Sequence, residues 1–168
     1  RGKQVEHSTA GSSWEQPFLR IHLNRPADGV TPPFRAVNRG RIEERPEGEH
    51  YSYEPNDCSV GDVDGDGEYE IIVKWNPTNA RDNSFRGYTE VYLDCYKLDG
   101  RQLWRIGLGK NIRAGAHYTQ FMVYDLDGDG RSEVACKTAP GTVDGTGKYV
   151  LLDGDDPLAD YRTPVGDE

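Results

Sequence analysis

The fold of this chain is decided by the stretch Asp62-Val-Asp64-Gly-Asp66-Gly-Glu68-Tyr-Glu70, which recurs sixty-three residues later as Asp125-Leu-Asp127-Gly-Asp129-Gly-Arg131-Ser-Glu133. Each copy places carboxylates at positions 1, 3, 5 and 9 of a nine-residue turn, with glycine at positions 4 and 6, where the backbone can fold back sharply. Carboxylates held this close repel one another, and a hard cation removes the repulsion. Ca²⁺, which takes six to eight oxygens at about 2.3–2.6 Å, suits the pattern.

These loops differ from the loop of a helix-loop-helix calcium sensor. In that motif the bidentate acid stands at position 12, which here is Val73 in the first copy and Cys136 in the second. The acid comes at position 9 instead, and an apolar strand follows it at once, so each loop joins two strands. We therefore expect structural calcium. The expected ligands are Asp62, Asp64, Asp66, Glu68 and Glu70 in the first loop, and Asp125, Asp127, Asp129, Arg131 and Glu133 in the second.

Composition bounds the classes of partner. The chain has 168 residues, of which 35% are apolar, and 20 Lys and Arg against 29 Asp and Glu give a net charge of −9. Nucleic acid and anionic membrane surfaces are therefore poor partners. No apolar run approaches the ~18 residues of a membrane span. Cys58, Cys95 and Cys136 lack the spacing of zinc ligands, and we expect small buried residues at these positions.

Strand-like segments dominate the rest of the chain. Residues 18–23 alternate apolar and polar side chains and predict a half-buried strand, whereas 24–50 reads as an extended, helix-free connector rich in proline, glycine and charge. Strands are expected from Tyr51 onward, including a hairpin across Asp99-Gly100. Their predicted ranges are 58–60, 69–75, 90–98, 102–108, 119–124, 133–138 and 148–153.

One repeat thus holds four antiparallel strands, which is typical of a β-propeller blade. Propellers close with ~4–8 blades, and this chain supplies about two. The predicted fold is all-β: an incomplete β-propeller, with residues 1–50 as the tail of a small β-domain and connector and 51–168 as the first blades. The remaining blades are expected elsewhere in a longer parent chain.

Much of the sequence resembles the rhamnogalacturonan lyases of polysaccharide lyase family eleven. The resemblance covers roughly 51–147 and lies in Asn56–Trp75, Asn76–Asn79, Tyr92–Gly100, Leu103–Ile106, Asn111–Phe121, Ala135–Ala139 and Gly141–Gly145. It implies a secreted, calcium-stabilised, eight-bladed propeller that cleaves the rhamnogalacturonan I backbone of pectin. The implied reaction is β-elimination at galacturonate.

This chemistry requires a base at C5 and a cation at the uronate carboxylate. His117, on a glycine-bounded turn before a strand, is the candidate base. Lys74 and Lys137 stand at equivalent places four residues beyond the position-9 acids, and Lys137, near the Gly141–Gly145 turn, is the better candidate for contacting a uronate. The plainer interpretations are a turn histidine bonded to backbone and two structural lysines.

Three further residues are candidates for substrate binding. Arg113 could hold a carboxylate with two hydrogen bonds. The resemblance implies that Asn56 and Asn76 lie at the cleft, although both also suit turns. The family commonly has Asp where this chain has Asn76, a departure that could alter sugar affinity. Aromatic residues that could stack on sugars, or pack in the core, are Trp75, Trp104 and Tyr118.

The alternative to an enzyme is a binding module without catalytic activity. Integrin-like propellers use similar acidic loops as supports beneath a protein-binding face. The long match through 109–121 favours the lyase over that module. A third possibility is a fragment that has lost activity and only binds calcium and pectin pieces.

Overall fold

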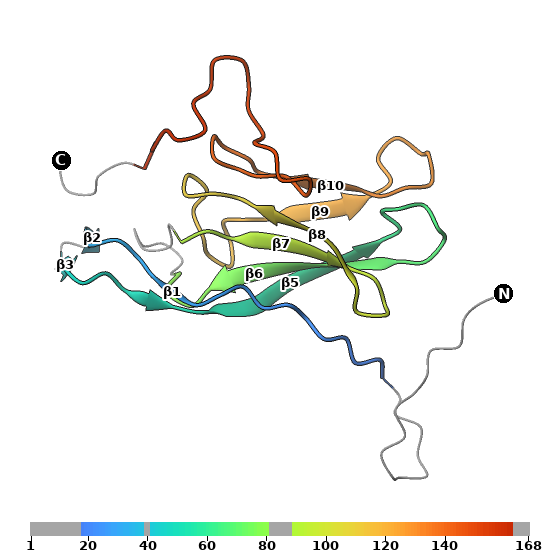
Figure 1. Ribbon diagram of the computed structural model, residues 1–168, viewed down its shortest axis with the longest axis horizontal. Helices are drawn as coiled ribbons and strands as arrows, with labels where there is room; N and C mark the ends of the chain where they lie inside the picture. The colour runs from blue at the N-terminus through green and yellow to red at the C-terminus, as the bar shows by residue number, and fades with distance from the viewer. Residues whose placement is uncertain (1–17, 39–40, 81–88, 163–168) are drawn as a thin grey trace, which may run out of the picture.

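All regular structure in the described residues is β-strand (Figure 1). The computed structural model describes residues 18–38, 41–80 and 89–162, so the polar stretch 1–16 lies outside it. The strands are β1 (Gly29–Val30), β2 (Phe34–Asn38), β3 (Arg41–Arg45), β4 (His50–Tyr51), β5 (Tyr53–Gly61), β6 (Glu70–Pro77), β7 (Tyr92–Tyr96), β8 (Gln102–Gly107), β9 (Phe121–Tyr124) and β10 (Glu133–Cys136). The predicted all-β class is confirmed. None of the described segments is a helix long and apolar enough to cross a membrane.

A four-stranded antiparallel sheet forms the centre of the molecule. Its strands lie in sequence order, β5-β6-β7-β8, as the repeat predicts. The expected hairpin joins β7 to β8: Gly100 has φ of 89°, which only glycine adopts freely, and its N–H donates to the carbonyl of Lys97. β6 and β7 are buried on both faces, whereas the outer strand β5 is largely exposed.

The second hairpin, β9 and β10, packs on one face of this sheet. Ile72 of β6, Cys95 of β7 and Val123 of β9 form a buried apolar cluster. The two sheets lie side by side with roughly parallel strand directions in Figure 1. The second copy of the repeat therefore begins with a hairpin packed against the sheet of the first copy, and the contact between the sheet and the hairpin is apolar at its centre.

A buried polar network covers the opposite face. Asp94 is fully buried and accepts hydrogen bonds from Trp75 Nε1 at 2.8 Å and Tyr96 OH at 2.7 Å, while Arg105 donates to both of its carboxylate oxygens at 2.6 Å. Arg105 also donates to the carbonyl of Asn24 at 2.6 Å. This network fastens the segment before β1 onto the sheet.

Four local predictions were wrong. Residues 18–23 form no strand, because among the described residues no strand lies alongside to pair with them, and Phe18 and Leu19 are exposed. The connector 24–50 has no helix in its described residues, as predicted, but it is not a plain connector: it contains β1, β2, β3 and the start of β4, and β2 and β3 pair locally despite the flanking prolines. Residues 148–153 make one isolated bridge, from Tyr149 to Val143, and no strand. Cys58 is exposed because it lies on the open outer strand β5.

Candidate functional site

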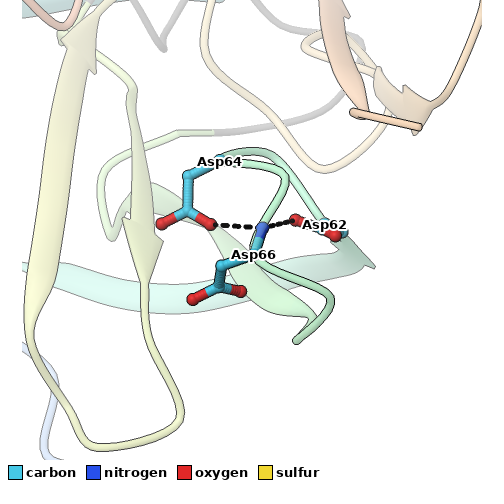
Figure 2. A group of neighbouring side chains, drawn as sticks. All are labelled: Asp62, Asp64 and Asp66. Carbon is cyan, nitrogen blue, oxygen red and sulfur yellow. Dashed lines mark hydrogen bonds between the residues drawn. The ribbon is translucent and has the colours of Figure 1, made fainter. Parts of the chain in front are cut away.

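The first acidic loop folds around its leading carboxylate. Asp62 accepts hydrogen bonds from the N–H groups of Gly65, Asp66 and Gly67, at 2.6, 3.2 and 2.8 Å. Gly65 and Gly67 have φ of 75° and 87°, so the glycines at positions 4 and 6 are required by the turn. Carboxylate oxygens of Asp62, Asp64 and Asp66 lie within 4.8 Å of one another (Figure 2). The dashed lines in Figure 2 are the bonds from the Asp66 N–H to its two neighbours.

The second loop repeats this backbone geometry. Asp125 accepts from the N–H groups of Gly128, Asp129 and Gly130, at 2.7, 3.1 and 3.0 Å. The acids that come together differ, however: oxygens of Asp125, Asp127 and Glu133 lie within 4.8 Å of one another. Arg131 has no side-chain oxygen and could contribute only its backbone carbonyl. The carboxylates at positions 1, 3 and 9 of this loop fit a calcium ion in chemistry and spacing.

A lysine from outside the first loop explains the difference. The Lys97 ammonium lies 2.7 Å from Asp64, 2.7 Å from Asp66 and 2.8 Å from Glu70. Glu70 is fully buried and turned toward this lysine, so it does not join the other acids. The carboxylates of Asp64, Asp66 and Glu70 hold the pKa of Lys97 above its usual range, and the hydrogen bond from Lys97 lowers the pKa of Asp66.

The two loops contact each other. The Ser132 N–H donates to the carbonyl of Asp62 at 2.6 Å, and the Arg131 side chain packs against Gly65, where an added Cβ would lie 2.7 Å from Arg131 Nε. A change in one loop therefore reaches the other through direct contact.

A second buried lysine joins two regions that the sequence predicted to bind substrate. Lys74 is fully buried, and its Nζ lies 2.5 Å from Asp57 Oδ2 and donates to the carbonyl of Ala116 at 3.3 Å. Asp57 and Asn56 lie in a bulge of β5, between the paired residues Pro55 and Cys58. Ala116 directly precedes His117, so Lys74 holds the bulge close to the turn that carries the candidate base.

The predicted substrate residues have distinct environments. Asn56 and His117 are exposed, on the bulge and the turn respectively. The Oδ1 atom of Asn76 is buried and accepts no hydrogen bond from the described residues. Arg113 lies 4.0 Å over the ring of Tyr118, and its Nε and Nη2 are likewise buried with no acceptor in the described part of the chain. Buried polar atoms of this kind usually have a partner.

The two lysines at equivalent places of the repeat are not equivalent in the structure. Lys74 is buried in an ion pair, whereas Lys137 is exposed just beyond β10. Trp75 is buried and donates to Asp94, and Trp104 packs against the apolar cluster, so these two tryptophans serve the core. A surface pocket of about 490 Å³ between β1, β4 and Thr78 contains none of the predicted site residues.

Sequence reasoning missed two charged residues, Lys97 and Asp94, and did not foresee the buried ion pair of Lys74 with Asp57. Each is a lone charge in or beside an apolar strand run, such as Ile71-Ile-Val-Lys-Trp75. That pattern is a usable signal, because charged side chains are rarely fully buried unless they are paired.

The fold and the loops define an all-β protein built from repeats that carry acidic, glycine-rich turns. Comparison with known proteins gives the family. Residues 35–167 match the family described as rhamnogalacturonan lyase family 11, C-terminal domain. The chain belongs to this family.

Relatives with known names agree. The chain is 55% identical over 166 residues to the rhamnogalacturonan endolyase YesW of Bacillus subtilis strain 168, and 52% identical over 167 residues to the exolyase YesX of the same strain. These matches cover 98% and 99% of the chain but 24% of each relative, so the chain spans about a quarter of their length. Among solved structures, that of the exotype lyase YesX matches with a TM-score of 0.74 and 54% identity, over 89% of this chain and 22% of that one. A Bacillus licheniformis rhamnogalacturonan lyase matches with a TM-score of 0.63 and 49% identity, over 77% of this chain and 26% of that one.

Proposed function

We propose that this chain is part of a secreted lyase that cleaves rhamnogalacturonan I, the pectin backbone, by β-elimination at galacturonate. The match to the lyase family over residues 35–167 carries the proposal. It also favours an enzyme over the integrin-like binding module, since the relatives are named as lyases. In the parent protein, the four-stranded sheet and the β9–β10 hairpin belong to successive blades of an incomplete propeller that the rest of the chain closes.

The reaction assigns a role to each candidate residue. A base removes the C5 proton of galacturonate, a cation offsets the charge that builds on the uronate carboxylate, and the bond at C4 breaks. His117 is the proposed base, and Lys137 or Arg113 the proposed carboxylate partner. Arg113 Nε and Nη2 have no acceptor among the described residues, which supports this assignment, because a carboxylate would accept a hydrogen bond from both in one plane. Asn56 and Asn76 bind sugar hydroxyls.

Calcium is proposed as a structural ion. A bound ion would offset the carboxylate repulsion of an acidic loop without taking part in the reaction. The second loop supports this proposal through the grouping of Asp125, Asp127 and Glu133.

The test of activity uses the full-length protein that contains this chain. Incubation with rhamnogalacturonan I and calcium should generate the ultraviolet absorbance of an unsaturated uronate product. Absence of that absorbance from mildly acidic to alkaline pH would contradict the proposal and favour the binding module, whereas binding to the polysaccharide without cleavage would indicate a protein that has lost activity and only binds pectin pieces.

Substitution tests the roles. His117→Ala should lower kcat by about 10²–10⁴-fold, the range for loss of a general base. His22→Ala, at another exposed histidine, is the matched control and should leave kcat unchanged. Equal activity of His117→Ala and wild type would remove His117 from the mechanism.

A further inference from the structure

Lys97 is placed in the first loop by the register of the sheet. Ile71 of β6 pairs with Tyr96, the last residue of β7, so Lys97, which follows it directly, comes beside Glu70, where the loop ends. The Lys97 side chain is 7% exposed and lies against three carboxylates. An ammonium group has three N–H donors, and three acceptors face them here.

This contact completes the bonding of the first loop. The N–H groups of the loop occupy both oxygens of Asp62 and one oxygen each of Asp64, Asp66 and Glu70. Lys97 occupies the second oxygen of each of the last three. Every carboxylate oxygen at positions 1, 3, 5 and 9 therefore contacts a nitrogen donor of the chain.

The second loop has the same internal bonds and lacks the lysine. Its N–H groups occupy both oxygens of Asp125 and one oxygen each of Asp127, Asp129 and Glu133. No described residue donates to the other oxygens of these three acids, Asp127 Oδ2, Asp129 Oδ2 and Glu133 Oε1, and no described lysine or arginine forms an ion pair with them. They correspond, position for position, to the oxygens that Lys97 contacts in the first loop.

We propose that Lys97 is the resident cation of the first loop and that, of the two loops, only the second binds calcium. This inference rests on the proposed structural role of calcium. An ammonium group and a divalent ion cannot share the same oxygens, because their charges repel and Ca²⁺ needs six to eight oxygens at about 2.3–2.6 Å. The first loop thus keeps the calcium-loop backbone with its own side chain as the counter-charge.

Counting bound calcium tests the inference separately from lyase activity. Equilibrium dialysis of the full-length protein gives the number of ions per chain. Asp64→Asn should leave this number unchanged, whereas Glu133→Gln should lower it by one. Lys97→Met frees the first loop and should raise it by one, and Lys148→Met, at an exposed lysine, is the matched control with no change.

Two results would overturn the inference. One is loss of a bound ion in Asp64→Asn, which would place calcium in the first loop beside Lys97. The other is an unchanged number of ions in Glu133→Gln, which would remove calcium from the second loop while leaving the lyase assignment intact. If Lys97→Met fails to fold, Asp64→Asn and Glu133→Gln, which keep the lysine, still decide the matter.

Discussion

The two copies of the nine-residue loop have the same backbone and different surroundings. Each wraps its leading aspartate in three N–H bonds, and each has its position-9 glutamate bound to the second residue of the loop. In the first copy, Lys97, which directly follows the neighbouring strand β7, contacts the acids, and Lys74, four residues beyond Glu70, is buried. In the described residues no lysine contacts the acids of the second copy, and Lys137, the equivalent of Lys74, is exposed. Loops with the same spacing of acids and glycines can therefore have their acid oxygens contacted by a side chain from elsewhere in the chain or not, depending on what packs beside them.

The largest expected difference is at position 9. In EDTA, Glu70→Gln should destabilise the protein by about 3 kcal/mol, because it removes a fully buried partner from Lys97. Glu133→Gln should change stability by less than about 0.5 kcal/mol without calcium, since the exposed second loop then loses only repulsion. Urea unfolding followed by tryptophan fluorescence measures both. Equal losses would mean that Lys97 does not distinguish the loops.

The equivalent lysines should differ next. Lys74→Met leaves Asp57 and the Ala116 carbonyl without their donor, and should cost about 1–3 kcal/mol. Lys137→Met removes an exposed side chain and should cost less than about 0.5 kcal/mol. Thermal unfolding of the two variants compares them. A larger loss of stability in Lys137→Met would contradict the expected difference between the two lysines.

The smallest expected difference is at the first glycine of each loop. Gly65 and Gly128 have φ of 75° and 79°, so alanine at either position should cost about 1–2 kcal/mol through backbone strain. A Cβ at Gly65 would also meet the Arg131 side chain, whereas one at Gly128 would meet nothing within 4 Å. Because Arg131 is exposed and can move, the excess at Gly65 should be under about 0.5 kcal/mol. The same unfolding assay measures both alanine variants in a protein that also carries Arg131→Ala. There the two losses of stability should be equal, and a loss that stays larger for Gly65→Ala would contradict the contact with Arg131.

Local patterns predicted the strands that flank the loops and the hairpin at Asp99-Gly100, because these depend on residues close in sequence. The patterns failed at residues 18–23, where apolar and polar side chains alternate, and at 148–153, where apolar residues run together, because the described residues supply no full partner strand. They also missed β2 and β3, whose pairing outweighs the prolines around them.

The candidate site shows the same division. Sequence spacing picked out the acids of both loops, the glycine-bounded turn singled out His117, and the resemblance to the lyase family pointed to Asn56; the last two are exposed. The contact of Lys97 with Glu70 could not be predicted from local sequence, since the two residues are 27 positions apart and meet only through the pairing of β6 with β7.

The sequence alone determined the turn geometry of the loops, because glycine and aspartate at fixed spacing leave the backbone one way to fold back and bond to itself. Only the tertiary structure decided which charged side chains meet the acids of each loop. A charge is balanced by whatever lies within a few ångströms, and strand pairing sets which distant residue that is. Asp62–Glu70 and Asp125–Glu133 thus share one motif in sequence and have different surroundings in the structure.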